Sequence, residues 1–314
     1  MKITIAASLL TVACMMNAQI WPDAKPPIAE KQNHIRDIHG EKVSDPYYWM
    51  IDYFKKGKDS TKVVNYLNAE NAYLETMMAD TKQLRANLYE EMKARIKEKD
   101  ESVPVFKNGY YYYSRTETGK QYFKYCRKKA NLSAPEEILL DVDQMAEGKA
   151  YYTATGFSIS PDNSKMIYGV DDVSRRQYSL FLKDLNTGKI TDLGIKNTEG
   201  NAVWAADNNT IFYTAKNDVT LLSEKIKRHT LGTDPSKDAV VYEEKDNTNY
   251  IGVGKSKNEK YIMIYSSATT SSEVRYLPAD NPNGGFKVFQ PRMKDVLYDI
   301  TPLEDKFLIT TNKD

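Results

Sequence analysis

The chain has 314 residues, of which 41% are hydrophobic and 28% charged, a composition typical of a globular protein with one large or two ordinary domains. Its 44 Lys and Arg residues nearly balance its 43 Asp and Glu residues, which leaves a formal net charge of +1. Such a chain has no strong field to attract nucleic acid or an anionic membrane surface, and we expect neither as a partner.

The N-terminus has the zones of a secretory signal: Lys2, an apolar run over residues 3–16 and a small residue at Ala18. About 14 apolar residues are fewer than the roughly 20 that a spanning helix needs, which favours a signal over a short membrane anchor. We therefore expect a signal peptide over residues 1–18 and export to the periplasm. Cys14 loosely matches a lipoprotein cysteine, so a lipid anchor is the minority alternative.

Cleavage at Ala18 would leave Cys126 as the sole cysteine, which excludes an intramolecular disulfide in the mature chain. Cys126 lies in an alternating aromatic stretch over residues 122–127. This pattern predicts a buried thiol on a strand rather than a nucleophile.

Residues 19–97 are predicted to form an N-terminal arm with helices. Prolines forbid regular structure near residues 21–27, and helical spacing of apolar residues then begins after a possible cap at Ser60. A second helix is predicted over residues 82–96. Its apolar stripe is expected to pack against other parts of the protein rather than to hold a cofactor, and consists of Leu84, Leu88, Met92 and Ile96.

Residues 98–314 are predicted to form only β-strands and turns, because short runs rich in Tyr, Val, Ile and Phe alternate with turn residues. A pattern of a polar turn followed by an apolar strand recurs along this region. Its spacings are 45, 51 and 46 residues, measured between Ile167, Phe212, Met263 and Ile309. A period near 45 predicts four-stranded β-propeller blades. We expect four to five blades, the last with about two strands, so the chain would be either a fragment or the product of a truncated gene model.

Catalytic and metal-binding patterns are not found. The nearest approach to a G-x-S-x-G elbow is Gly156 to Ser160, which lacks the second glycine. Gly254-Lys255-Ser256 resembles the end of a phosphate-binding loop, but a strand follows it instead of a helix. No metal or cofactor is expected, and three histidines are interpreted as structural or exposed, namely His34, His39 and His229.

Arg175 and Arg176 stand between two predicted strands, so they should project from one rim of the propeller. Adjacent guanidinium groups on a protein surface are usually just solvated. If they faced carboxylates of another domain, they would make strong bidentate contacts. The sequence by itself favours the solvated interpretation.

From about Pro26 to Asp314 the chain resembles oligopeptidase B in the prolyl oligopeptidase family of serine peptidases. The segments that carry the resemblance are DPYYW at 45–49, YLNAENAY at 66–73, SRRQY at 174–178, VTLL at 219–222, RHTLGT at 228–233, YEEKD at 242–246 and SATTSSEVR at 267–275. The resemblance implies an incomplete seven-bladed propeller, preceded by an α-helical arm that packs on an α/β-hydrolase domain not contained in this chain.

The same resemblance implies that the whole protein cleaves short peptides after Arg or Lys, with the propeller admitting substrates by size. The triad would lie in the hydrolase domain, so this chain alone would be inactive, and Arg175 and Arg176 would make interdomain or substrate-gating contacts. Two alternatives stay open, which are a propeller that binds peptide or protein without catalysis and a proline-specific oligopeptidase.

Overall fold

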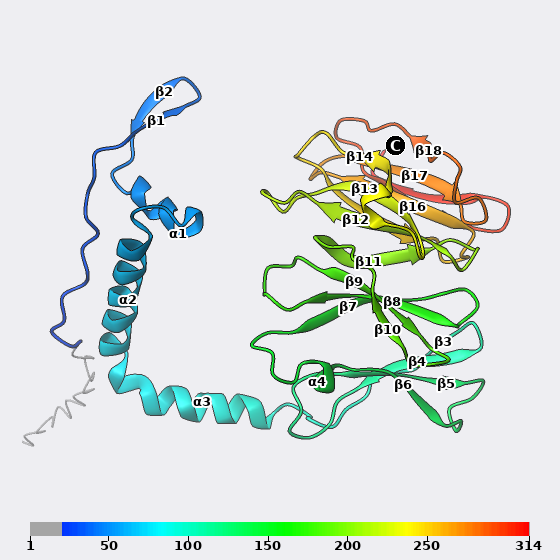
Figure 1. Cartoon of the computed structure of the whole chain (residues 1–314), viewed down its shortest axis with the longest axis horizontal. Helices are drawn as coiled ribbons and strands as arrows, with labels where there is room; N and C mark the ends of the chain where they lie inside the picture. Colours follow the sequence, from blue (N-terminus) through cyan, green and yellow to red (C-terminus); the bar gives the residue numbers. More distant parts are fainter. Residues whose placement is uncertain (1–20, 314) are drawn as a thin grey trace, which may run out of the picture. The chain divides into compact units, whose positions relative to one another are not determined.

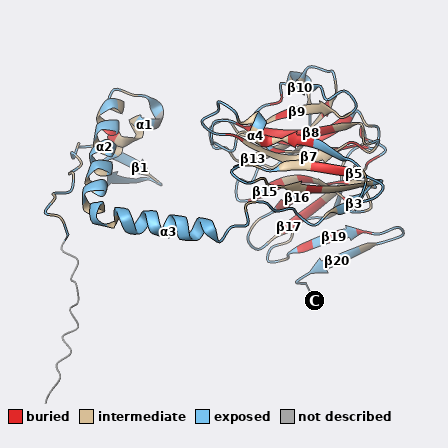
Figure 2. Ribbon diagram, turned by 90° about the horizontal axis from the view of Figure 1, so that it is seen from below, coloured by how far each residue is buried: buried red, intermediate tan, exposed pale blue. Residues whose placement is uncertain are grey.

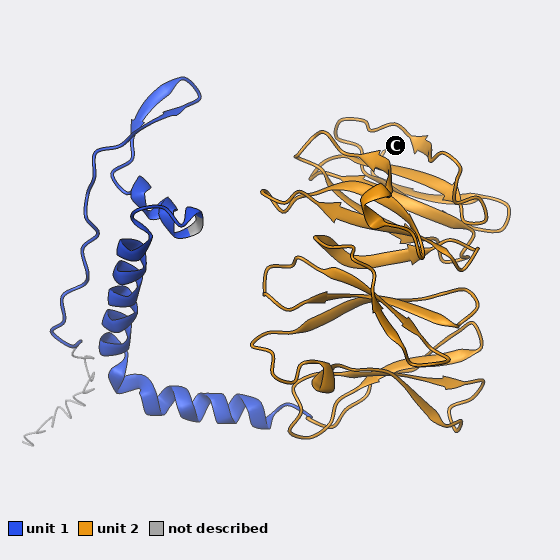
Figure 3. Cartoon of the chain, viewed as in Figure 1, with its two compact units in different colours: residues 1–97 blue, residues 98–314 orange. Residues whose placement is uncertain are grey.

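The computed structural model describes residues 21–313 and divides the chain into two compact units, Met1–Lys97 and Glu98–Asp314 (Figure 3). The predicted signal peptide, including Cys14 and Ala18, lies outside the described residues.

The first unit combines a short hairpin with helices. Residues 21–34 have neither helix nor strand, which includes the predicted irregular segment at residues 21–27. The helical segments are η1 (Tyr48–Ile51), α1 (Asp52–Lys55), α2 (Ser60–Met77), η2 (Ala79–Thr81) and α3 (Lys82–Ala94). The hairpin of β1 (Ile35–Ile38) and β2 (Glu41–Ser44) was not predicted, because its mostly exposed residues show no apolar alternation. Its two-residue turn has positive φ at His39 and Gly40, 55° and 84°.

Helices α2 and α3 confirm the predicted helices but not the predicted cap. Asp59, rather than Ser60, is the N-cap residue of α2, and its side chain makes no capping hydrogen bond. The stripe on α3 and the residues after it has side chains that are 46–67% exposed (Figure 2). This exposure does not contradict the expected packing, because the family resemblance implies that the arm packs on a hydrolase domain not contained in this chain.

The second unit consists of consecutive antiparallel sheets, which we call blades 1 to 5 in chain order (Figure 1). Blade 1 comprises β3 (Val105–Lys107), β4 (Tyr110–Arg115), β5 (Lys124–Lys129) and β6 (Glu136–Asp141). The short helix α4 (Val142–Met145) follows it. Blade 2 comprises β7 (Thr153–Ile159), β8 (Lys165–Asp171), β9 (Ser179–Asp184) and β10 (Ile190–Asp192).

Blades 3 and 4 also have four strands each, and blade 5 has two. Blade 3 comprises β11 (Thr198–Trp204), β12 (Thr210–Lys216), β13 (Ser223–Thr230) and β14 (Ala239–Glu243), with the 3-10 turn η3 (Pro235–Lys237) before β14. Blade 4 comprises β15 (Tyr250–Lys255), β16 (Tyr261–Ser267), β17 (Ser272–Pro278) and β18 (Lys287–Gln290). Blade 5 comprises β19 (Tyr298–Pro302) and β20 (Phe307–Thr311). The mainly β propeller class is confirmed.

The predicted repeat marks the second strand of each of blades 2 to 5. Ile167, Phe212 and Met263 are fully buried, each in the core toward the following blade. In each of these three strands the residues on either side of the buried one point toward the preceding blade. The strands are therefore apolar on both faces. Ile309 occupies the same place in β20 but is 55% exposed, because no further sheet covers that face within the described residues.

Three glycines let blades 2 and 3 approach closely. Gly156 in β7 and Gly200 in β11 have positive φ, and both strands are bulged near these residues. A Cβ on Gly169 of β8 would lie 2.4 Å from backbone atoms of Gly200. Side chains are therefore excluded where the two blades meet.

Candidate functional site

A cavity of about 390 Å³ lies among the inner parts of blades 1 to 4. Its walls are mainly apolar and aromatic, and the largest side chains among the lining residues are Tyr112, Tyr113, Tyr125, Phe157, Met166 and Trp204. The Trp204 indole N–H donates to the Ser158 carbonyl at 2.9 Å, which leaves the ring to form an apolar wall. The size and lining are those of a small-ligand site.

The hairpins that join the first two strands of blades 1 and 4 contribute the charged groups of the cavity. Lys107 Nζ lies 2.6 Å from Glu259 Oε1, and the Asn108 amide donates to the other carboxylate oxygen at 3.4 Å. Burial alone would raise the pKa of Glu259, but its bonds to Lys107 and Asn108 lower that pKa overall. Glu259 therefore joins blade 4 to blade 1 as an anion.

Lys255 is the other charged group in the cavity wall. Its ammonium makes neither a hydrogen bond nor an ion pair within the part of the chain that the structure describes. Burial lowers the pKa of Lys255, and the Lys107 charge acts in the same direction, whereas Glu259 opposes both. With the two lysines and one carboxylate counted together, the cavity has one unbalanced positive charge.

Asparagine side chains tie the equivalent hairpins of blades 1 to 3 together. The Asn163 amide donates to the Asn108 carbonyl at 3.1 Å, and the Asp162 backbone N–H donates to Asn208 Oδ1 at 2.9 Å. Asn163 and Asn208 both have positive φ, a conformation that asparagine tolerates in turns. These bonds hold the hairpin end of the cavity in a defined shape.

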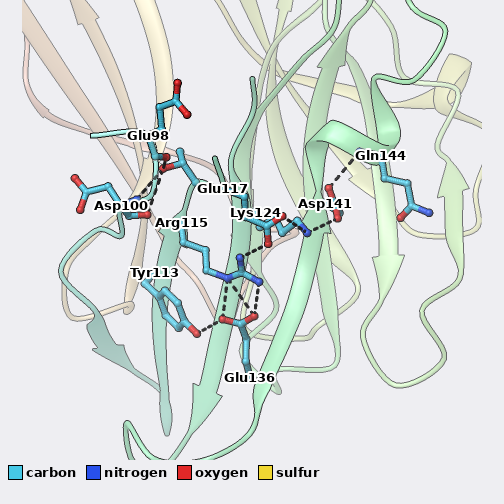
Figure 4. Close-up of polar contacts among 10 residues, drawn as sticks. Glu98, Asp100, Tyr113, Arg115, Glu117, Lys124, Glu136, Asp141 and Gln144 are labelled. Atoms are coloured by element: carbon cyan, nitrogen blue, oxygen red, sulfur yellow. Dashed lines mark hydrogen bonds and ion pairs between the residues drawn. The ribbon is translucent and has the colours of Figure 1, made fainter. Parts of the chain in front are cut away.

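A second polar cluster lies in blade 1 and is fully paired (Figure 4). Arg115 donates to both oxygens of Glu136 at 2.9–3.2 Å and to Glu117 at 2.5 Å. Lys124 lies 3.1 Å from both Glu117 and Asp141. The hydrogen bonds from Arg115 hold the pKa of Glu136 below its usual value. Because each of these charges has a partner, the cluster is suited to clamp strands rather than to transfer protons.

Cys126 is confirmed as a buried strand thiol, in β5 beside this cluster. Burial raises the pKa of its thiol to about 11, with a further contribution from Glu136. The thiolate that nucleophilic chemistry requires is therefore disfavoured.

Arg175 and Arg176 lie in the loop from β8 to β9, and both are exposed. Their backbone N–H groups donate to the buried Asp171 carboxylate at 3.0 and 2.7 Å. Neither guanidinium forms an ion pair within residues 21–313. Asp171 thus fixes the backbone of this loop and leaves both side chains free to contact other groups.

The three histidines have structural surroundings. His34 stacks on Tyr48 at 4.0 Å between ring centroids, and His39 is in the turn of the first hairpin. His229 Nδ1 lies 2.7 Å from Asp238 Oδ1, with side-chain exposures of 1% and 2%. Such a pair resembles the base and orienting acid of a hydrolase, but it is closed to substrate.

Within residues 21–313 no group of three or more His, Cys, Asp or Glu side chains is arranged to hold a metal ion. Over the same residues no helix is both long and apolar enough to span a bilayer.

Sequence reasoning missed the groups that shape these features, namely Glu259, Asp171 and Asp238. Lys255 was considered only as part of a failed phosphate-loop match, and its position at the end of β15 confirms that no such loop is present. The sequence signal that could have identified Lys255 is its place as the last residue of an inner strand that has no other charged residue.

The stacked, four-stranded antiparallel sheets define a β-propeller protein. The chain belongs to the family described as "Prolyl oligopeptidase, N-terminal beta-propeller domain", whose model matches residues 26–314. The family resemblance found in the sequence is thereby confirmed.

Known relatives extend well beyond the matched region. Dipeptidyl aminopeptidase BI of Pseudoxanthomonas mexicana is 39% identical over 328 residues, which cover 100% of this chain and 45% of that protein. Protease 2 of Moraxella lacunata is 33% identical, with 92% and 42% covered. The structure of oligopeptidase B from Leishmania major superposes with a TM-score of 0.83 at 30% identity, over 92% of this chain and 43% of that one. The chain therefore spans less than half the length of these relatives.

Proposed function

We propose that the chain is the propeller-bearing N-terminal portion of an exported serine oligopeptidase that hydrolyses short peptides after Arg or Lys. The main support is its similarity to the Leishmania oligopeptidase B structure, with a TM-score of 0.83. Export, to the periplasm, rests on the signal pattern of residues 1–18.

In this proposal the hydrolytic groups belong to an α/β-hydrolase domain outside residues 21–313. The described residues offer a buried His229–Asp238 pair but no exposed nucleophile beside a base. The propeller acts on substrate access: the cavity lined by the Lys107–Glu259 pair has a volume of about 390 Å³, which is too small for a folded protein. Short, flexible peptides fit such a constraint.

The proposal predicts that the full-length gene product cleaves a blocked fluorogenic peptide ending in Arg, whereas residues 1–314 alone do not. Initial rates for Arg, Lys and Pro at the cleaved position measure the specificity. Substitution of the hydrolase serine is the control for a contaminating protease. Activity in neither protein would contradict the peptidase proposal and favour a binding propeller.

Release of dipeptides from free N-termini is a second candidate, favoured by the 39% identity to a protein named dipeptidyl aminopeptidase. The same assay separates the two activities. Cleavage of an unblocked dipeptide substrate, but not of its acetylated form, would replace the endopeptidase proposal.

Arg175 and Arg176 are proposed to contact carboxylates of the hydrolase domain. The double variant Arg175→Ala/Arg176→Ala should lower kcat/KM of the full-length protein about tenfold, because bidentate ion pairs between the domains would be lost. Its unfolding free energy should change by only about 0.5 kcal/mol, because both side chains are exposed.

Lys189→Ala/Lys196→Ala is the matched control, since both lysines are exposed on the same blade. Peptide hydrolysis and urea unfolding are measured for both double variants. An equal effect of the two on kcat/KM would reject the interdomain contact.

A further inference from the structure

The cavity of blades 1 to 4 contains a cation, Lys255, that has no partner among residues 21–313, whereas the other charged and amide groups in its wall are already engaged. Lys107 and Asn108 bind Glu259, and the Asn163 amide binds the Asn108 carbonyl. The hydroxyls of Tyr112 and Tyr113 donate to Asn163 and Glu136. Lys255 alone among the charged lining groups keeps its donors uncommitted within the described part of the chain.

The surroundings of Lys255 determine what a ligand must offer. A half-buried ammonium gains most from an anion that replaces its lost hydration, and the neutral Lys107–Glu259 pair does not provide one. The partly exposed side chains of Tyr125, Phe157 and Val203 supply an apolar surface in the same cavity. The hydroxyls of Tyr125 and Ser158 make no hydrogen bond within residues 21–313 and can donate to a ligand as well.

We propose that this cavity binds the free carboxylate end of a short peptide whose last side chains are apolar, with Lys255 as the carboxylate ligand and the aromatic walls around the side chains. A volume of about 390 Å³ accommodates roughly two residues. The site is independent of the hydrolytic activity proposed above, because it requires only the propeller.

Lys255 is suited to this role for a further reason. Burial penalises its charged form, so an empty site holds the ammonium at a cost that a carboxylate relieves. Binding of the anion would therefore raise the pKa of Lys255 toward its usual value.

The test is isothermal titration calorimetry of the 314-residue chain with N-acetyl-leucyl-phenylalanine and with its C-terminal amide. The acid should bind at least about tenfold more tightly than the amide, as expected for loss of a charge-assisted hydrogen bond. Equal affinities of acid and amide, or no binding of the acid at millimolar concentration, would overturn the proposal.

Lys255→Met should weaken binding of the acid about 10- to 100-fold, and Lys257→Met, at an exposed lysine two residues away, should not. Met fills a similar volume without a buried charge, so the fold should be retained, as thermal unfolding can check. Lys255→Arg should bind the acid better than Lys255→Met because it keeps a positive charge. If the Met protein unfolds, Lys255→Gln, which also removes the charge, takes its place in the test. Unchanged affinity in Lys255→Met would overturn the proposal.

Discussion

Replacement of His229 by alanine is expected to lower the unfolding free energy by about 3 kcal/mol or more. His229 lies in β13 with its ring 2.7 Å from Asp238, and the Tyr213 hydroxyl donates to the other oxygen of that carboxylate at 2.8 Å. The Asp238 side chain is only 2% exposed, so bulk water does not solvate its carboxylate in the wild-type protein. The variant leaves a buried carboxylate with one partner fewer, and a void beside it.

Urea unfolding of the wild-type and variant chains measures this loss. His229→Gln, whose amide can still donate, should be intermediate. Lys149→Ala is the control: it removes an ion pair of similar length to Asp172 at the surface, where the expected cost is below about 1 kcal/mol. A loss for His229→Ala no larger than for this control would show that the buried pair contributes little.

Gly169→Ala should also destabilise the chain, by about 3 kcal/mol, for a purely steric reason. The added Cβ would lie 2.4 Å from the Cα and carbonyl oxygen of Gly200 on the adjacent blade. Both positions are backbone atoms, so no side chain can rotate away, and blades 2 and 3 would have to separate. Gly169 has no positive φ, so alanine there would add a steric clash without backbone strain. At Gly156 or Gly200, where φ is positive, the two effects could not be separated.

Gly252→Ala provides the matched control, because Gly252 is in the inner strand of blade 4 and no atom lies within 4 Å of the place that a Cβ would occupy. Alanine there should be neutral or slightly stabilising, within about 1 kcal/mol. Thermal or urea unfolding of both variants gives the comparison. Similar stabilities would mean that the contact between blades 2 and 3 relaxes easily.

The propeller could be predicted from the sequence because its signals are local and repeated. The second strand of each blade is buried on both faces, so β8, β12 and β16 appear as apolar runs after similar turns. Each run specifies a strand by itself, and the period then specifies the architecture.

The sites could not be predicted in the same way, because their partners come from distant or shifted strands. Asn108 and Glu259 are 151 residues apart and meet only when blades 1 and 4 are assembled. Asp238 is placed beside His229 by the pairing of Arg228 with Ala239, but a register shift in that pair of strands hides this relation in the sequence. The stripe on α3 is a different case, since a helical period predicts the helix but cannot say which surface covers it.

The link from Glu259 to Lys107 and Asn108 also bears on how the protein is made. A ribosome that adds roughly 5 to 20 residues per second needs about 8 to 30 s to proceed from Asn108 to Glu259, a separation of 151 residues. Blades 1 to 3, whose strands pair only with chain neighbours, can form during that interval. Until blade 4 emerges, the aromatic wall of the cavity is open to solvent, which makes this the period in which a nascent chain would benefit from a chaperone.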